Sequence, residues 1–374
     1  MSTAMTGIAA PGRGALRIAA EDRFEGGAGE AKTREAETRF GGSTDRGAVR
    51  ARAELLLVEP PRARGGAVPW ILDADGRRAP GYDDARRLRE IRTGLLGHAR
   101  VFAGVADTSP EEVERVVGAL HEDHYLAALA RAGARSGEPE LLAELAQPGL
   151  EPDTPVHGEA VSSAREAVGV AIAAARLVLA GARYAYALCR PPGHHAGPGW
   201  LGGYCYLNNA AAAAHTLREG GVDRVGILDV DLHYPNGTSA MVARMDAVTL
   251  HSLHGATGAN LPWERVRPQS EREHLIAFRG PPGPDAYLDA LAGFTATLAG
   301  ETDAIVLSLG YDLIAGDPHG CWDFGAPVFS RIGHLLARSA RPVCIVQEGG
   351  YAIGSLAACG RAFAGGLLDG VETS

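Results

Sequence analysis

The stretch Val225–Ser239, VGILDVDLHYPNGTS, decides our interpretation of this chain. It opens with an apolar run typical of a buried strand, and Asp229, Asp231 and His233 then follow at every second position. Because side chains alternate between the two faces of an extended strand, we expect these three groups to share one face. Two buried carboxylates and an imidazole would desolvate and repel one another, and a bound cation removes that cost. This mixed donor set favours zinc or a similar first-row ion over calcium or magnesium.

Length, charge and cysteine content limit the class of protein. A chain of 374 residues with 46% hydrophobic content can hold one large α/β domain. We expect that domain over residues 51–374, after a disordered tail over residues 1–50. A net charge of −9 without a basic stripe argues against nucleic-acid binding. No apolar run reaches the roughly 18 residues of a membrane span and the five cysteines are scattered, so we expect a cytoplasmic protein with no membrane partner.

Apolar strands alternate with helical segments along most of the chain. We expect strands at Ala53–Val58, Tyr184–Leu188, Val225–Leu228, Ala247–Leu253, Ala304–Leu309 and Pro342–Gln347. We expect helices at Tyr82–Leu96, Pro110–Ala132, Ala160–Ala180, Asn208–Glu219, Pro284–Leu298 and Val328–Ser339. This alternation predicts a three-layer α/β fold, with a mainly parallel sheet covered by helices on both faces. In such sheets, functional sites lie beyond the carboxyl ends of the strands.

Four further polar clusters follow predicted strands or lie near them. They are RPPGHHA at 190–196, GGYCYLNN at 202–209, SLGYD at 308–312 and QEGGY at 347–351. GGYCYLNN is weak alone, and the aspartate of SLGYD is a helix cap as often as a ligand. Together they would bring imidazoles, carboxylates and a phenol to one edge of the sheet. Asp231, His233 and Asp312 would leave one coordination position open for water, as in catalytic zinc sites.

With these motifs the chain resembles the histone deacetylase and acetylpolyamine amidohydrolase family, on the side of its second class and bacterial relatives. RPPGHHA, GGYCYLNNAA, ILDVDLHYPNGT, SLGYD and QEGGY occur in the family's order and approximate spacing, between about Tyr82 and about Leu367. The resemblance implies the arginase/deacetylase fold and metal-assisted hydrolysis of an acetyl or short acyl amide. It also implies an acylated amine as substrate, either an acetylpolyamine or an acetyl-lysine peptide, and leaves the oligomeric state open.

The resemblance implies two cation sites in each chain. One zinc ion would be held by Asp231, His233 and Asp312. A potassium ion would be held by the side chains of Asp229 and Ser252, together with the backbone carbonyls of Asp231, His233 and Leu253.

Catalytic and channel roles follow from the same resemblance. His195 matches the general base that later acts as acid, with Asn236 as the partner of its ring. His194 matches the electrostatic member of the histidine pair, held by Asp229, and Tyr351 matches the hydrogen-bond donor to the oxyanion. The substrate channel would include Gly203, Tyr204 and His319.

Three departures from the family pattern leave substrate and assembly open. Tyr234-Pro235 stands where the family usually has His-Gly. His319 stands at the channel mouth, where polyamine-selective members can carry glutamate. The loop between Ala132 and Ala160 is short compared with the dimerising insertion of bacterial polyamine deacetylases.

Three rival interpretations remain open at this point. An arginase-like enzyme with two manganese ions would need carboxylates two residues after His233 and Asp312, where Pro235 and Ile314 stand. The second rival is a catalytically silent protein that binds acyl amines. The third keeps the chemistry but acts on a pathway-specific metabolite.

Overall fold

The computed structural model describes residues 54–61, 69–72, 77–135, 137–256 and 270–369. The predicted tail over residues 1–50 lies outside these residues, and the extent of the domain stays a prediction. Within the described part of the chain, no helix is both long and apolar enough to cross a bilayer. The expected cytoplasmic location and the expected absence of nucleic-acid and membrane partners also stay predictions.

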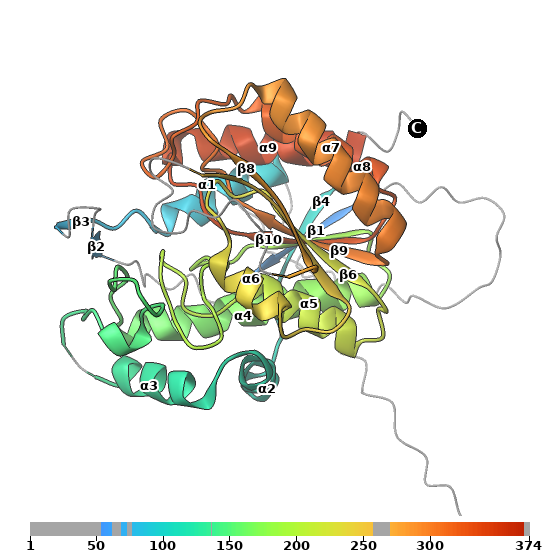
Figure 1. Cartoon of the computed structure of the whole chain (residues 1–374). Coiled ribbons are helices and arrows are strands. Elements are labelled where there is room, and N and C mark those ends of the chain that lie inside the picture. The colour runs from blue at the N-terminus through green and yellow to red at the C-terminus, as the bar shows by residue number, and fades with distance from the viewer. Residues whose placement is uncertain (1–53, 62–68, 73–76, 136, 257–269, 370–374) are drawn as a thin grey trace, which may run out of the picture.

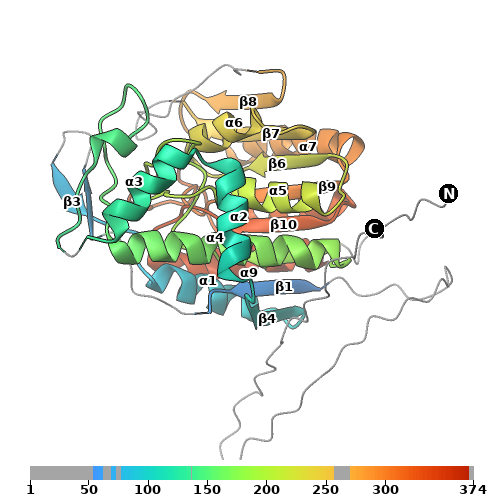
Figure 2. The same cartoon turned by 90° about the horizontal axis from the view of Figure 1, so that it is seen from below.

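One parallel sheet of eight strands runs through the centre of the described residues (Figure 1). All seven strand pairings are parallel. In spatial order the strands are β4 (Val101–Val105), β1 (Leu55–Glu59), β5 (Tyr184–Ala187), β10 (Val343–Gln347), β9 (Ala304–Leu309), β6 (Val225–Asp229), β7 (Val248–Gly255) and β8 (Glu273–Phe278). A separate antiparallel pair, β2 (Trp70–Leu72) and β3 (Arg78–Pro80), projects to one side (Figure 2).

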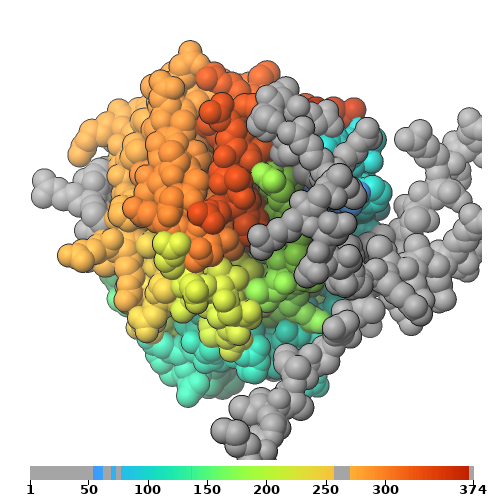
Figure 3. Space-filling model, turned by 90° about the vertical axis from the view of Figure 1, so that its right-hand side faces the viewer, coloured from blue at the N-terminus to red at the C-terminus, as the bar shows by residue number. Residues whose placement is uncertain are grey.

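Helices cover both faces of the sheet, so the predicted three-layer fold is confirmed. One layer consists of α1 (Arg86–Leu96), α7 (Pro284–Glu301), α8 (Pro327–Arg338) and α9 (Ile353–Asp369). The opposite layer consists of α4 (Gly158–Leu179), α5 (Asn209–Glu219) and α6 (Asn236–Val242), with α2 (Pro110–Leu120) and α3 (Asp123–Gly133) packed outside it. Seen from the side in Figure 3, orange and red residues of the first layer lie over yellow and green residues of the second.

Strand residues alternate between two hydrophobic cores. In β10, Val343 and Ile345 belong to the core formed with α1, α7, α8 and α9, whereas Cys344 and Val346 belong to the core formed with α4 and α5. Every residue of β10 is buried, because helices exclude water from both faces. This double burial explains why the central strands were visible in the sequence as continuous apolar runs.

The single helix expected over Pro110–Ala132 is wrong, because the chain breaks into α2 and α3 at His121 and Glu122. The backbone of His121 is extended, with φ −107° and ψ 150°. Its buried ring places Nδ1 3.0 Å from the carbonyl oxygen of Gly197, and Nε2 accepts the N–H of Asn208 at 3.2 Å. These partners lie far along the chain, so the local amphipathic pattern did not indicate the break.

Several elements were not expected from the sequence. Strands β4 and β8 form the two edges of the sheet and are only partly buried, and β8 begins with the polar residues Glu273 and His274. Helix α9 contains glycines that lower helix propensity, and packing supports it instead. A Cβ at Gly366 would lie 1.8 Å from the carbonyl oxygen of Ser330, so glycine is required where α9 crosses α8.

The buried His121 should make stability depend on pH. Burial lowers the pKa of His121 from 6.5 to about 4. Since the folded-state pKa lies below the unfolded one, protons bind preferentially to the unfolded chain. The contribution is complete above about pH 6.5 and is lost as pH falls toward 4, to a total of about 3 kcal/mol. Urea unfolding between pH 7.5 and 4.5 should therefore show a shallower pH slope for His121→Gln than for the wild type.

The matched control for this measurement is His124→Gln, three residues away on α3. The side chain of His124 is 72% exposed, so its replacement should leave the pH slope unchanged. Equal slopes for His121→Gln and the wild type would show that His121 titrates in the folded protein as it does in the unfolded chain.

Candidate active site

Four neighbouring strands deliver the candidate site residues. Strands β5, β10, β9 and β6 are adjacent in the centre of the sheet. Because they are parallel, their carboxyl ends meet at one edge, where α/β sheets place their sites. The segments that follow these strands carry His194 and His195, Tyr351, Asp312, and Asp231 and His233, respectively.

The structure brings together the three residues expected to bind zinc. Ligand atoms of Asp231, His233 and Asp312 lie within 4.8 Å of one another, and all three residues are buried. His233 Nδ1 lies 3.2 Å from Asp231 Oδ1 and 3.0 Å from Asp312 Oδ2. The expected strand alternation is wrong in detail, because β6 ends at Asp229 and the next residues form bends. Asp231 and His233 therefore reach the site from a loop.

Two glycines leave the space that these carboxylates occupy. A Cβ at Gly349 would lie 2.6 Å from Asp231 Oδ2, and a Cβ at Gly310 would lie 2.7 Å from Asp312 Oδ1. The backbone N–H of Gly349 also donates to Asp231 Oδ2 at 2.9 Å. Two buried carboxylates and one imidazole, held in a cradle without competing side chains, fit a first-row divalent cation.

Burial and crowding shift the protonation of this cluster. Burial, aided by the charge of Asp231, raises the pKa of Asp312 to about 7. Burial opposes a charged imidazole, but hydrogen bonds to Asp231 and Asp312 raise the pKa of His233 to about 10. Protons thus reduce the repulsion between the carboxylates, and a divalent cation can take the place of those protons.

The histidine pair has two different environments, although the ring centroids are only 4.1 Å apart. His194 Nδ1 lies 3.2 Å from Asp229 Oδ2, whereas His195 Nδ1 lies 2.6 Å from Asn236 Oδ1. Burial opposes charge on His194, but the carboxylates of Asp231 and Asp229 raise its pKa to about 10. Burial, together with positive charge on His194 and His233, lowers the pKa of His195 well below its usual value. One ring is therefore charged and the other neutral, the usual division between electrostatic and general-base roles.

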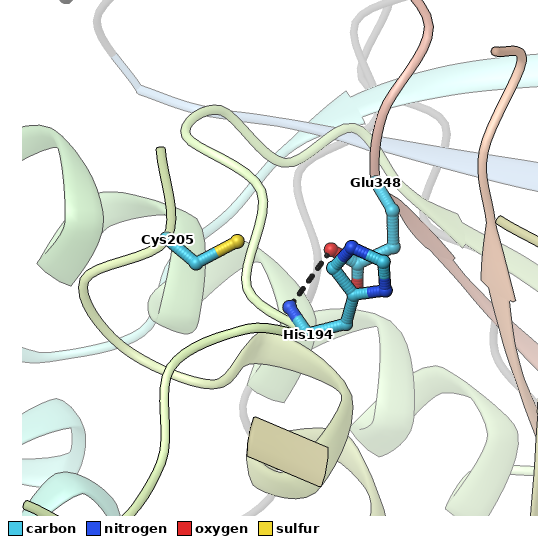
Figure 4. A group of neighbouring side chains, drawn as sticks. All are labelled: His194, Cys205 and Glu348. Atoms are coloured by element: carbon cyan, nitrogen blue, oxygen red, sulfur yellow. Dashed lines mark hydrogen bonds between the residues drawn. The ribbon is translucent and has the colours of Figure 1, made fainter. Parts of the chain in front are cut away.

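Glu348 supports the loop that carries the histidine pair, a role not foreseen from the sequence. Its Oε2 accepts the N–H groups of Gly193 at 2.7 Å and His194 at 3.2 Å, and Oε1 accepts the hydroxyl of Ser308 at 3.3 Å. Figure 4 shows this carboxylate beside His194, with the thiol of Cys205 facing the same space. Ligand atoms of these three residues also lie within 4.8 Å of one another. Because this carboxylate ties the histidine loop to β9 through Ser308, we interpret Glu348 as structural support.

Arg87 on α1 fixes the loop that carries Tyr351. It is 0% exposed, and it donates to the carbonyl oxygens of Gly350 and Glu348 at 2.6 Å each. Its guanidinium carbon lies 4.4 Å from the centre of the Tyr351 ring, and it forms a buried ion pair with Asp83. Sequence reasoning missed Arg87, because an arginine in an amphipathic helix normally faces water.

The predicted channel residues Tyr204 and His319 lie beside Tyr351. The Tyr204 hydroxyl is 2.8 Å from His319 Nε2 and accepts the N–H of Tyr82 at 3.2 Å. The Tyr351 ring centre is 5.5 Å from that of Tyr204 and 4.9 Å from that of His319. Burial lowers the pKa of His319 to about 4, so this side chain is uncharged at neutral pH. Gly203 precedes Tyr204 in the same turn.

The side chains expected at a potassium site come from neighbouring strands. Asp229 of β6 is directly opposite Ser252 of β7 in the sheet register. Asp229 Oδ1 accepts the N–H of Asp231 at 3.0 Å, and Ser252 Oγ lies 2.9 Å from His254 Nδ1. Binding of potassium here stays a prediction.

Comparison with known proteins identifies the family. Residues 83–367 match the histone deacetylase domain. The chain is 37% identical over 221 residues to acetylpolyamine amidohydrolase 1 of Pseudomonas aeruginosa, which covers 57% of this chain and 64% of that relative. The match thus spans just under two thirds of the relative's length. A histone deacetylase-like amidohydrolase of Pseudomonas aeruginosa is 31% identical over 327 residues, which cover 82% of this chain and 77% of that protein.

A solved structure agrees with these sequence matches. The crystal structure of acetylpolyamine aminohydrolase from Burkholderia pseudomallei superposes with a TM-score of 0.71 and 28% sequence identity. The superposition covers 84% of this chain and 98% of that chain. As its motifs predicted, the chain belongs to the histone deacetylase family.

Proposed function

We propose that this chain is a metal-dependent amidohydrolase that removes an acetyl or short acyl group from an amine. The observation that carries this proposal is the convergence of Asp231, His233 and Asp312 within 4.8 Å, beside a pair of histidines in opposite electrostatic environments. Family membership supports the reaction class, since the relatives are acetylpolyamine amidohydrolases and a histone deacetylase-like amidohydrolase.

The three buried ligands would hold one zinc ion per chain. Mixed carboxylate and imidazole donors suit zinc, and three protein ligands are the usual number in its catalytic sites. When bound, such an ion polarises an acyl carbonyl and lowers the pKa of a coordinated water. Asp229 and Ser252 would contribute to a separate potassium site beneath the histidine pair.

The chain's own residues divide the remaining work. With Nδ1 donating to Asn236, His195 can take up a proton from the attacking water at Nε2 and later return it to the departing amine nitrogen. His194, kept charged by Asp229, adds positive charge next to the reacting carbonyl. The Tyr351 hydroxyl donates a hydrogen bond to the carbonyl oxygen as it becomes negative. The products are a short-chain acid and a free amine.

The substrate is an acylated amine, of either the acetylpolyamine or the acetyl-lysine type. Tyr204 and His319 are placed beside Tyr351, so we assign them to the wall and mouth of the acyl channel. The mouth residue is neutral, because burial keeps the pKa of His319 near 4. A neutral mouth neither repels a cationic amine nor supplies the carboxylate that would select one.

The direct test is hydrolysis by zinc-loaded protein. Protein stripped with a chelator and reloaded with Zn²⁺ should hold about one ion per chain by elemental analysis. It should release acetate from acetylspermidine or from an acetyl-lysine peptide, and the stripped form should not. Failure of the loaded protein on acetylated and longer acylated amines would remove the proposed reaction. Full activity after complete stripping would remove the metal from it.

Tyr351→Phe should lower turnover by roughly 10²–10³, because one oxyanion donor is lost. Zinc content should stay unchanged, since Tyr351 is not among the proposed ligands. The matched control is Tyr184→Phe, which removes a hydroxyl at the amino-terminal end of β5, where it accepts from the Arg183 side chain at 2.9 Å. Equal turnover in the two variants would take Tyr351 out of the mechanism.

A further inference from the structure

We propose that Asp153 and Thr154 are positioning residues that hold Tyr204 in the wall of the acyl channel. The inference rests on the proposed function, because it assigns these two residues a part in substrate binding. Neither residue belongs to a motif that the sequence singled out. Both stand in the irregular segment before α4, about fifty positions from the turn that they contact.

The turn that carries Tyr204 has a strained backbone. Gly203 has φ 53° and Tyr204 has φ 68°, so two consecutive residues lie in the left-handed region. Glycine adopts this conformation readily, but it is unfavourable for tyrosine. Gly202 and Cys205 close the turn by exchanging backbone hydrogen bonds of 3.1 and 2.8 Å. A strained conformation of this kind persists only where the surrounding structure fixes it.

Asp153 and Thr154 supply that fixation. The N–H of Gly203 donates to Asp153 Oδ2 at 3.0 Å and Oδ1 at 3.2 Å, and the N–H of Tyr204 donates to Thr154 Oγ at 3.0 Å. The Thr154 hydroxyl in turn donates to Asp153 Oδ1 at 2.8 Å. Thr154 is 0% exposed, so no water can replace its oxygen as the acceptor. Each N–H of the strained pair therefore has its own side-chain acceptor.

The segment that contains Asp153 and Thr154 is itself anchored by neighbouring parts of the chain. Leu72 of β2 donates its N–H to the carbonyl oxygen of Asp153 at 3.2 Å. The hydroxyl of Tyr206, just beyond the turn, donates to the carbonyl oxygen of Pro155 at 2.6 Å. Val156 exchanges backbone hydrogen bonds of 2.8 and 3.2 Å with Glu140. Because the segment cannot move freely, its two side chains determine where the turn lies.

The position of the turn determines the channel wall. The Tyr204 hydroxyl joins the N–H of Tyr82 to His319 Nε2, and its ring packs against Tyr351. A shift of the turn would therefore displace the wall and the mouth together. The metal ligands follow β6 and β9, so they would keep their places. The histidine pair lies earlier in the same β5–α5 connection as the turn, but Glu348, Asp229 and Asn236 hold it independently of Asp153 and Thr154. We expect loss of this support to weaken substrate binding more than the chemical step.

The test uses Thr154→Val, which removes the acceptor at nearly constant shape, and Thr154→Ser, which restores it. In the zinc-loaded full chain, Thr154→Val should raise KM for an acetylated amine about tenfold, with kcat within about threefold of the wild type. Thr154→Ser should return KM to near the wild-type value. Thr295→Val is the matched control, because Thr295 is also buried and its hydroxyl donates to the carbonyl oxygens of Leu291 and Ala292 within α7.

A second readout does not depend on activity. Cys205 is fully buried in the same turn, so loosening the turn should expose its thiol. Alkylation followed by peptide mass spectrometry should show Cys205 reacting about tenfold faster in Thr154→Val, with buried Cys344 as the internal reference. Asp153→Asn, which keeps one acceptor oxygen, should shift both readouts in the same direction by less, and it serves as the test variant if Thr154→Val does not fold.

The outcomes separate this inference from the proposed function. If Thr154→Val has the same labelling rate and KM as Thr295→Val, Thr154 does not fix the turn that carries Tyr204. Faster labelling with unchanged KM would overturn the role in the channel. If the wild-type protein hydrolyses no acylated amine, the proposed function fails and the channel role fails with it, while the labelling rates alone decide whether Asp153 and Thr154 hold Tyr204.

Discussion

Asp312→Ala should abolish zinc binding and, with it, amide hydrolysis. Asp312 is fully buried, and its Oδ2 lies 3.0 Å from the ring of His233, so it would supply one of only three protein ligands. Loss of a residue that merely supports a ligand costs about 10–100-fold in metal affinity, so loss of a ligand should exceed about 100-fold. Elemental analysis after gel filtration should find near one zinc per chain in the wild type and almost none in the variant.

Thermal unfolding gives the same test without an activity assay. A ligand that binds only the folded state raises its stability, so added zinc should raise the melting temperature of the stripped wild type. It should leave the melting temperature of Asp312→Ala unchanged. Asp323→Ala is the matched control, because this aspartate lies eleven residues further along the chain and is exposed to solvent. A full zinc complement in Asp312→Ala would remove Asp312 from the metal site.

The central sheet was predictable because its strands are buried on both faces. A strand such as β10 reads as an unbroken apolar run, and the polar residues that follow it must lie at the carboxyl edge. Asp231, Asp312 and the histidine pair are predicted to meet at this edge for the same reason. The edge strands β4 and β8 were not predicted: both are only partly buried, and β8 begins with Glu273 and His274.

The supporting residues could not be predicted in this way. Arg87, Glu348 and Asp153 act through backbone groups that are far away in the sequence, and no spacing rule connects them to those groups. The bend after β6 was not predicted either. Polar residues at every second position fit an extended strand, but the same spacing also occurs in a loop beyond the end of a strand. The reactive groups were thus encoded locally, whereas the groups that orient them depend on tertiary contacts.

His195→Ala should lower turnover by about 10²–10⁴ while the protein keeps its zinc. His195 is buried, its pKa is depressed by burial and by positive charge on His194 and His233, and its Nδ1 is tied to Asn236 at 2.6 Å. It is therefore a neutral base, and its ring centre lies 5.9 Å from that of the proposed metal ligand His233. The measurement is kcat for acetate release, with zinc content determined on the same samples.

Two further variants serve as comparisons for His195→Ala. Asn236→Ala leaves the imidazole in place but removes the oxygen that orients it, so its loss should be smaller than that of His195→Ala. His215→Ala, on α5 and away from the strand ends, should leave turnover unchanged. If His195→Ala lost less than about tenfold while His194→Ala lost more, the general base would have to be His194. The charged state that Asp229 and Asp231 impose on His194 argues against that assignment, because a ring that already carries its second proton cannot accept another.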